Sequence, residues 1–255
     1  MIELKSVTAG YGSHTVLKDI SAFFEKGQLT GIIGVNGCGK STLLKVMLNL
    51  LPLTGGEVTI DGIGIPNLNR REIARKVAYL AQEKNTPDMT VEQMVLHGRF
   101  PYLEYPRRYS GQDRQIVQAA MTQMGIESFA AKSLSTLSGG MRQKAYLAMA
   151  LAQSTDYILL DEPTTFLDIA HQFSLMNTLR ELADSGKGII AVMHDLPMAF
   201  AFFDRILLLH DGRVVCYDKP ANLCRLGVIE DTFGVSVVPS SEDRGYHYQY
   251  PFIEK

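Results

Sequence analysis

The chain has 255 residues, of which 46% are hydrophobic and 20% are charged. This is the composition of a globular protein, long enough for a sizeable core in one large domain or two small ones. The formal net charge of −2 provides no overall basic character, which argues against a nucleic-acid partner.

The sequence also argues against secretion and membrane spanning. Three cysteines (Cys38, Cys216 and Cys224) have neither metal-ligand spacing nor the even count of a disulfide framework, which favours a reducing compartment. Glu3 and Lys5 place charges within the apolar amino-terminal stretch, so this stretch is not expected to be a signal peptide. Because no run of about 18 apolar residues occurs, we expect this chain to reach any membrane only through a partner.

The first predicted elements are strands. Residues 2–24 alternate apolar and polar positions between glycines, which predicts edge strands. Leu29–Val35 is a nearly continuous apolar run, as expected of a strand buried on both faces of a parallel sheet. A glycine-rich break at 36–39 follows, and Lys40–Leu51 has helical spacing.

The middle of the chain is predicted to be helical. It contains three segments with helical spacing and no convincing strand. These segments are Val91–His97, Gln112–Met124 and Gly140–Ala152. We therefore expect a helical subdomain at 89–152, inserted into an α/β core formed by 1–88 and 153–238.

The second half of the core returns to strands and helices. Buried strands are predicted at Tyr157–Leu160 and Gly188–Met193, each followed by polar residues and a helical pattern. Two short apolar runs around Asp211 and Gly212 predict a hairpin. The polar and aromatic stretch 239–255 is treated as a carboxyl-terminal tail.

A phosphate-binding loop follows the first buried strand. The sequence Gly-Val-Asn-Gly-Cys-Gly-Lys-Ser has the spacing of such a loop and lies between a strand and a helix, as the motif requires. Its glycines let backbone N–H groups point at phosphate oxygens, and the helix start favours an anion. Lys40 is expected to reach the β- and γ-phosphates, and the Ser41 hydroxyl to hold Mg²⁺. The expected nucleotide-binding residues are Gly34, Asn36, Gly37, Cys38, Gly39, Lys40, Ser41 and Thr42.

Cys38 has two interpretations. It is either a small residue that fills a tight turn or a thiol whose pKa is lowered at a helix N-terminus. The first interpretation, a small residue in a tight turn, is favoured as the biological role. With either interpretation, an adduct on this thiol would block the phosphate site.

Two acidic residues end the strand predicted at Tyr157–Leu160. Parallel sheets bind ligands at the carboxyl ends of their strands, where the phosphate loop also lies. Asp161 is suited to hold Mg²⁺, and Glu162 to orient or deprotonate the attacking water. The structural alternative is that Asp161 and Glu162 only cap a helix before Pro163. The presence of a phosphate loop in the same chain favours the catalytic interpretation. His194 ends another buried strand and is either structural or a contact to the γ-phosphate or the catalytic water.

Residues 137–143, Leu-Ser-Gly-Gly-Met-Arg-Gln, closely resemble the signature of the ABC ATPases. In that family the signature caps the nucleotide of the opposite subunit. The resemblance therefore implies that Ser138, Gly139 and Gly140 contact ATP across a head-to-tail dimer, which we take to be a homodimer. It also implies an α/β fold: a P-loop NTPase (RecA-like) core with an antiparallel β subdomain and an inserted helical subdomain.

Other positions match the same family in order. Tyr11 matches the aromatic residue that stacks on adenine, although an edge-strand tyrosine is the structural alternative. Gln82 matches the glutamine that senses Mg²⁺ and relays to the permease. Asp168 matches the loop that crosses the dimer interface, and His194 matches the switch histidine. The resemblance extends over essentially the whole chain.

Three segments narrow the family further. Residues 95–102, 167–172 and 194–199 resemble ATPases of importers for metal chelates: iron–siderophores, haem and cobalamin. This resemblance implies an ATP hydrolase that uses ATP and Mg²⁺ with transmembrane permease subunits and an extracytoplasmic solute-binding protein. It implies a peripheral position at the cytoplasmic face of the inner membrane. A molybdate or tungstate importer, or an exporter with separate membrane subunits, remains an alternative.

The route to the permease is expected to run through Gln82 and the segment Gly98–Tyr102. Arg99 and Tyr102 are expected to pack against an incoming permease helix without touching nucleotide. A DNA-repair type of ABC ATPase is disfavoured because no sustained heptads separate the phosphate loop from the signature. A translation type would carry two cassettes and basic arms, which the sequence lacks.

Overall fold

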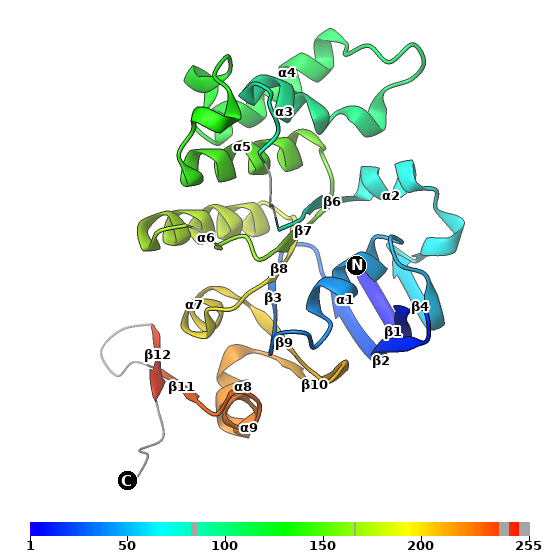
Figure 1. Cartoon of the computed structure of the whole chain (residues 1–255), viewed down its shortest axis with the longest axis vertical. Coiled ribbons are helices and arrows are strands. Elements are labelled where there is room, and N and C mark those ends of the chain that lie inside the picture. The colour runs from blue at the N-terminus through cyan, green and yellow to red at the C-terminus, as the bar shows by residue number, and fades with distance from the viewer. Residues whose placement is uncertain (83–85, 166, 240–244, 250–255) are drawn as a thin grey trace.

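The computed structural model describes residues 1–82, 86–165, 167–239 and 245–249 (Figure 1). Its centre is a six-stranded sheet in the order β10-β9-β3-β8-β7-β6, in which only the pair β9–β10 is antiparallel. The strands are β3 (Leu29–Gly34), β6 (Val77–Leu80), β7 (Tyr157–Asp161), β8 (Gly188–Val192), β9 (Arg205–His210) and β10 (Arg213–Asp218).

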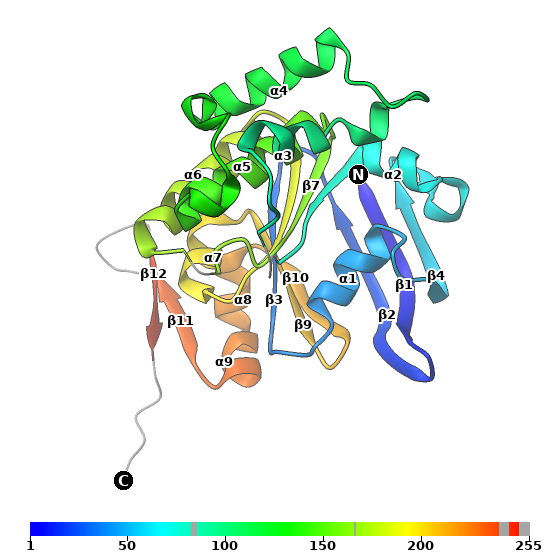
Figure 2. The same ribbon diagram turned by 45° about the horizontal axis from the view of Figure 1, so that its top comes forward.

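The central strands are mostly apolar because both faces of the sheet are covered. Every residue of β3, β7 and β8 is buried. Successive side chains point to opposite faces, so Ile158 packs into one core cluster and Leu159 into the other. One face is covered by α6 (Ile169–Asp184) and α7 (Leu196–Phe202), the other by α1 (Lys40–Met47), as Figure 2 shows.

A second, antiparallel sheet lies beside α1. Its order is β2-β1-β4-β5. The strands are β1 (Ile2–Tyr11), β2 (His14–Phe24), β4 (Leu53–Ile60) and β5 (Ile63–Gly64). The first two correspond to the predicted edge strands, whereas β4 and β5 were not predicted. Apolar side chains of β1, β2 and β4 share a core cluster with α1.

Helix α1 ends earlier than the sequence predicted. Its last residue is Met47, not Leu51, because Asn49 adopts a positive φ of 53° that a right-handed helix cannot contain. A short 3-10 helix η1 (Ile65–Asn67) and helix α2 (Arg70–Lys76) then connect β5 to β6.

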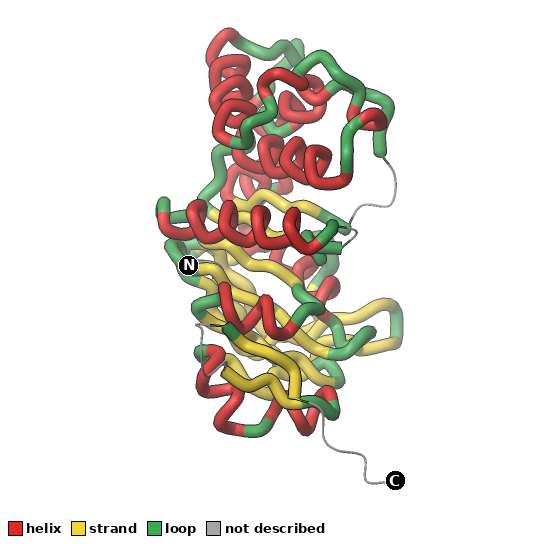
Figure 3. The backbone as a smooth tube through the Cα atoms, turned by 90° about the vertical axis from the view of Figure 1, so that its left-hand side faces the viewer, coloured by secondary structure: helices red, strands yellow, loops and turns green. Residues whose placement is uncertain are grey.

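Helices occupy one end of the molecule, visible in Figure 3. They are α3 (Val91–His97), η2 (Phe100–Tyr102), α4 (Gly111–Gln123), η3 (Glu127–Phe129), η4 (Leu134–Thr136) and α5 (Gly139–Ala152). Reciprocal capping boxes start α3 at Thr90 and α4 at Ser110, which explains why local sequence indicated where these helices begin. The subdomain boundaries at 89 and 152 stay predictions.

Part of the predicted carboxyl-terminal tail, 239–255, forms a strand. Helices α8 (Pro220–Leu226) and α9 (Val228–Phe233) lead into β11 (Ser236–Pro239), which pairs with β12 (Tyr246–Gln249). The rings of Tyr246 and Phe200 are 5.5 Å apart, so this hairpin packs on α7. Residues 240–244 and 250–255 lie outside the described residues. Among the described helices, none has the length and apolarity needed to cross a membrane.

Candidate nucleotide-binding and hydrolytic site

The predicted phosphate loop joins β3 to α1 in a shape that only glycine permits. Gly34 has φ 154°, and a Cβ there would lie 2.3 Å from the carbonyl oxygen of Leu209. Gly39 precedes α1 with φ 110°, and a Cβ there would lie 2.8 Å from Leu17 Cδ2. Side chains at either position would force the loop open.

Lys40 folds back into this loop. Its ammonium donates hydrogen bonds to the carbonyl oxygens of Gly34 (2.8 Å) and Val35 (3.1 Å), and the residue is only 6% exposed. Because α1 begins at Lys40, the first N–H groups of the helix have no acceptor within it. A buried cation and free N–H groups together form a site for an anion such as phosphate. Asn36 and Gly37 are exposed at the loop tip, and Thr42 is buried in α1.

Cys38 is a packing residue of the loop. It is 5% exposed, and burial raises the pKa of its thiol despite the opposing charge of Lys40. The interpretation of Cys38 as a thiol of lowered pKa is therefore wrong, because desolvation of a thiolate outweighs the nearby cation.

Asp161 meets the loop at the carboxyl end of β7. Its Oδ1 accepts a hydrogen bond from the Ser41 hydroxyl at 3.1 Å, and its Oδ2 accepts one from Tyr79 at 3.4 Å. Burial raises the pKa of Asp161, the adjacent Glu162 carboxylate raises it further, and the two hydrogen bonds oppose this. A divalent cation here would stabilise the charged carboxylate.

Tyr79 is a site residue that the motifs did not identify. It lies on β6, which pairs with β7, and burial together with Asp161 raises the pKa of its phenol. The phenol is thus a hydrogen-bond donor at neutral pH. Tyr79 could have been identified from the sequence by its position on an apolar strand, three residues before Gln82.

Glu162 lies between two polar side chains from different parts of the chain. Gln82 Nε2 donates a hydrogen bond to Glu162 Oε2 at 2.7 Å, and His194 Nε2 is 2.5 Å from Glu162 Oε1. The Thr165 hydroxyl also donates to Oε2, at 3.4 Å. A carboxylate held in this way can orient a water molecule or accept its proton. The structure therefore brings Gln82, Glu162 and His194 together.

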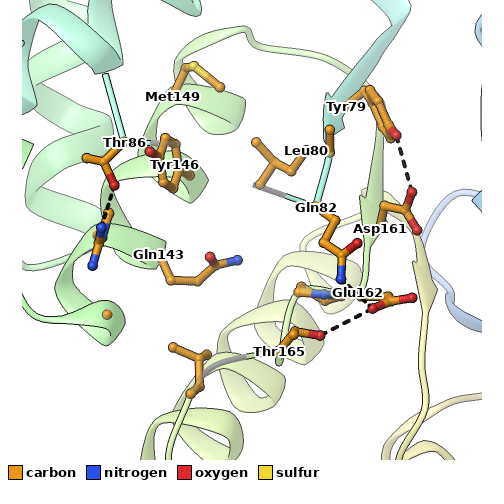
Figure 4. A pocket seen from close by; sticks show the side chains of 15 residues that line it. Tyr79, Leu80, Gln82, Thr86, Gln143, Tyr146, Met149, Asp161, Glu162 and Thr165 are labelled. Atoms are coloured by element: carbon orange, nitrogen blue, oxygen red, sulfur yellow. Dashed lines mark hydrogen bonds between the residues drawn. The ribbon is translucent and has the colours of Figure 1, made fainter. Parts of the chain in front are cut away.

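A cavity of about 440 Å³ opens beside Glu162, between the sheet and α5 (Figure 4). Figure 4 shows Gln82, Glu162 and Thr165 meeting on one side, with Gln143 and Tyr146 of α5 on the other. Small polar molecules can thus reach the carboxylate from this side.

Tyr11 presents an open ring at the end of β1. It is 48% exposed, and Lys45 of α1 lies 3.5 Å from its hydroxyl and 5.9 Å from its ring centre. An exposed ring beside the helix that follows the phosphate loop is available for stacking on a flat ligand.

The signature residues lie at the start of α5. Ser138 caps this helix by accepting a hydrogen bond from the Met141 N–H at 3.3 Å. Ser138 and Gly139 are exposed, whereas Gly140 is buried. Helices α5 and α1 lie apart in Figures 1 and 2, so α1 and the loop that precedes it are remote from this helix. Asp168 caps α6, and its side chain is 65% exposed.

The expected permease segment is only partly at the surface. Arg99 is 7% exposed and donates hydrogen bonds to Asp113 (2.9 Å) and to the carbonyl oxygen of Ala152 (2.8 Å). Tyr102 donates to the carbonyl oxygen of Gln153 at 2.9 Å. The expectation that Arg99 packs against a permease helix is therefore wrong, because this cation is used to join α3, α4 and α5.

Two neighbours of these residues are exposed instead. Phe100 is 47% exposed and lies under the guanidinium of Arg107, and Tyr105 is 97% exposed. Aromatic side chains with this exposure are suited to a protein contact.

Residues 17–165 match the family model described as ABC transporter. The ferric enterobactin transport ATP-binding protein FepC of Escherichia coli (strain K12) is 40% identical, over 91% of this chain and 86% of its own length. The petrobactin import ATP-binding protein FpuD of Bacillus anthracis is 38% identical, over 91% of this chain and 86% of its own length.

Two solved structures are similar over most of the chain. A dimeric bacterial ABC transporter cassette has a TM-score of 0.74 at 32% identity, over 86% of this chain and 99% of its own. The inward-facing structure of a metal-chelate type ABC transporter has a TM-score of 0.84 at 22% identity, over 99% of this chain and 98% of its own, which shows the shared fold. Together with the phosphate loop, these matches show that the chain belongs to the ABC transporter family as an ATP-binding, ATP-hydrolysing subunit.

Proposed function

We propose that this chain hydrolyses ATP to drive the uptake of a metal chelate (an iron–siderophore, haem or cobalamin) through separate permease subunits. The observation that carries the hydrolytic part is the Glu162 carboxylate, held by Gln82 and facing His194 at the sheet edge that also carries the phosphate loop. The ferric enterobactin and petrobactin relatives support the class of solute.

ATP is bound by the loop and by the open ring of β1. Lys40 exchanges its two carbonyl acceptors for the β- and γ-phosphates, and Tyr11 stacks on adenine. Glu162 orients the attacking water and accepts its proton, while His194 contacts the γ-phosphate. Glu162 and His194 already face each other in this structure, which supports their roles.

Mg²⁺ fits the donor set at the loop. The Ser41 hydroxyl and the Asp161 carboxylate are hard oxygen donors only 3.1 Å apart, and Gln82 lines the same cavity as Asp161. When bound, the ion neutralises charge on the phosphates during transfer.

A second copy of the chain completes the site. Ser138, Gly139, Gly140 and Asp168 of one subunit would contact the ATP held by the other, in a head-to-tail homodimer. The exposure of Ser138, Gly139 and Asp168, and the dimer of the related cassette, support this arrangement.

The dimer would lie at the cytoplasmic face of the inner membrane, below the permease and supplied by an extracytoplasmic solute-binding protein. Phe100 and Tyr105 are the exposed aromatic residues that we propose to contact the permease.

Uptake in vesicles tests the proposal. The chain is co-expressed with its permease, and the entry of labelled ferric siderophore, haem, cobalamin and molybdate is measured with and without ATP. We expect ATP-dependent uptake of one chelate, abolished by Lys40→Ala, which removes the only point charge of the loop. ATP-dependent uptake of molybdate alone would contradict this proposal in favour of a molybdate importer. Net export would contradict it in favour of an exporter.

A further inference from the structure

The ring of His171 lies directly on Gly140. His171 belongs to the first turn of α6, and Gly140 to the first turn of α5. A Cβ built on Gly140 would lie 2.0 Å from His171 Cδ2 and 2.6 Å from Nε2. The ring therefore fills the space that any side chain at position 140 would need.

Asp168 holds this ring in place. Its Oδ1 lies 2.7 Å from His171 Nδ1 and also accepts a hydrogen bond from the His171 backbone N–H at 2.9 Å. These hydrogen bonds lower the pKa of Asp168, so the carboxylate is ionised at neutral pH and can only accept. The Nδ1 atom must then carry a proton, which leaves Nε2 on the side of Gly140.

The contact joins two elements that are otherwise separate along the chain. Helix α5 ends the helical region, whereas α6 follows β7, which ends at Asp161 (Figures 1 and 2). Ser138 and Gly139 are exposed beside the buried Gly140. Asp168 is exposed beside the ring that it holds.

We propose that His171 is a positioning residue that clamps the signature segment to the loop carrying Asp168. The clamp keeps Ser138, Gly139 and Asp168 in a fixed relation, so that all three meet the partner subunit as one surface. It also explains why position 140 must be glycine within the subunit itself. The proposed benefit for ATP-driven dimerisation rests on the function proposed above, but the clamp itself is a property of one subunit.

Amide hydrogen exchange of the nucleotide-free chain tests the clamp without a dimer. The N–H groups of Met141 and Arg142 are bonded to Ser138 and report on the start of α5. In His171→Ala their exchange should be faster by about tenfold, the effect of losing one hydrogen bond to a charged group. Asn177→Ala, an exposed change on the same helix, should leave it unchanged.

His171→Asn should recover part of the protection, because its amide can still donate to Asp168. A merely structural loss of packing would not follow hydrogen-bonding ability in this way. Unchanged exchange in His171→Ala, or equal exchange in His171→Ala and His171→Asn, would overturn the clamp.

A double-mutant cycle tests the steric part. Gly140→Ala alone should displace the ring and speed exchange at Met141. Gly140→Ala combined with His171→Ala should be no worse than His171→Ala alone, because the displaced ring is already gone. Fully additive effects would show that the two residues are independent and would overturn the proposal.

ATP-driven dimerisation separates the clamp from the proposed function. In the Glu162→Gln background, light scattering should show dimers with ATP, and adding His171→Ala should raise the ATP concentration needed by about tenfold. If the Glu162→Gln parent stays monomeric, the dimer proposal fails, and the exchange data still decide the clamp. If parent and variant dimerise equally, His171 does not position the dimer face.

Discussion

Glu162 has a backbone conformation that is unusual for a non-glycine residue. Its φ is 54°, in the left-handed region, which costs on the order of 1 kcal/mol or more for a residue with a Cβ. With this conformation the carboxylate contacts Gln82, which follows β6, and His194, which follows β8, as well as the Thr165 hydroxyl. Strain of this kind persists where a function uses the side-chain direction that it produces.

Replacing Glu162 by Gln should therefore separate binding from turnover. The amide keeps the size of the side chain but accepts no proton, so ATP hydrolysis should fall by about 100-fold or more while ATP affinity stays within about threefold. Phosphate release and equilibrium ATP binding measure the two quantities. Glu181→Gln, an exposed change on α6, is the matched control and should alter neither. Hydrolysis near the parent rate would remove Glu162 from the reaction.

Cys38 should react slowly and only at high pH. Because burial raises the pKa of its thiol, the thiolate fraction at neutral pH is smaller than that of a free cysteine. The rate of labelling by iodoacetamide is measured against pH by mass spectrometry of the Cys38 peptide. In the folded chain this rate should level off at a higher pH than in the same chain unfolded in urea. Saturating ATP should slow it further. Identical pH profiles in the folded and unfolded chains would contradict the buried position.

At the scale of elements, the sequence predicted the strands and helices that are specified by interactions between residues close together in the chain. The continuous apolar runs of β3, β7 and β8 and the capping boxes of α3 and α4 are properties of neighbouring residues. The site residues at strand ends were predicted for the same reason, because the carboxyl ends of parallel strands share one edge.

The elements and contacts that sequence reasoning missed depend on distant partners. Strand β4 begins with Leu-Thr-Gly-Gly, a turn-like sequence, and forms because β1 offers it an edge. Strand β12 pairs with β11 and packs on α7, neither of which its own residues reveal. Arg99 was expected to pack against a permease helix, whereas it is buried by its ion pair with Asp113 and its hydrogen bond to the Ala152 carbonyl oxygen, two partners that are distant in the sequence.

The β11–β12 hairpin should support the start of α7. The Leu196 N–H donates a hydrogen bond to the Tyr248 hydroxyl at 3.2 Å, two residues after His194. Tyr248→Phe should lower the free energy of unfolding by about 1 kcal/mol, or the Tm by about 2–4 °C. Tyr246→Phe keeps the ring that meets Phe200 in an edge-to-face contact, and it serves as control in the same thermal denaturation experiment. If Tyr248→Phe, Tyr246→Phe and the parent all have the same Tm, this hydrogen bond contributes nothing to stability.

Arg99 should matter for stability. Arg99→Ala would leave the Asp113 carboxylate buried without its cation, at a cost of about 3 kcal/mol or more in urea unfolding. Adding Asp113→Asn should recover part of this loss because it removes the unpaired charge. Arg114→Ala breaks only an exposed pair with Glu92 and should cost at most about 1 kcal/mol. Similar losses in Arg99→Ala and Arg114→Ala would argue against a buried pair.

At the scale of the whole molecule, the nucleotide site and the surface proposed to contact the permease are on different parts of the chain. The phosphate loop, Glu162 and His194 gather at one edge of the six-stranded sheet. Phe100 and Tyr105 follow α3 in the chain, and α3 lies in the helical region (Figure 1). Arg71 of α2 joins these parts by donating to the carbonyl oxygens of Pro101 and Leu103. The segment after α3 is thus tied to α2 by hydrogen bonds from one side chain.

The exposed aromatics should therefore be needed for transport and not for ATP binding. Phe100→Ala with Tyr105→Ala removes apolar area that no described core cluster uses, so the isolated chain should bind ATP with unchanged affinity and melt within about 2 °C of the parent. In the reconstituted complex, solute uptake should fall by about tenfold or more, as for other buried aromatic contacts of an interface. Leu226→Ala removes another exposed apolar residue, on α8, and should leave uptake unchanged. Normal uptake by the Phe100 and Tyr105 variant would move the permease contact elsewhere, whereas lost ATP affinity in the isolated chain would show that these residues act through the fold.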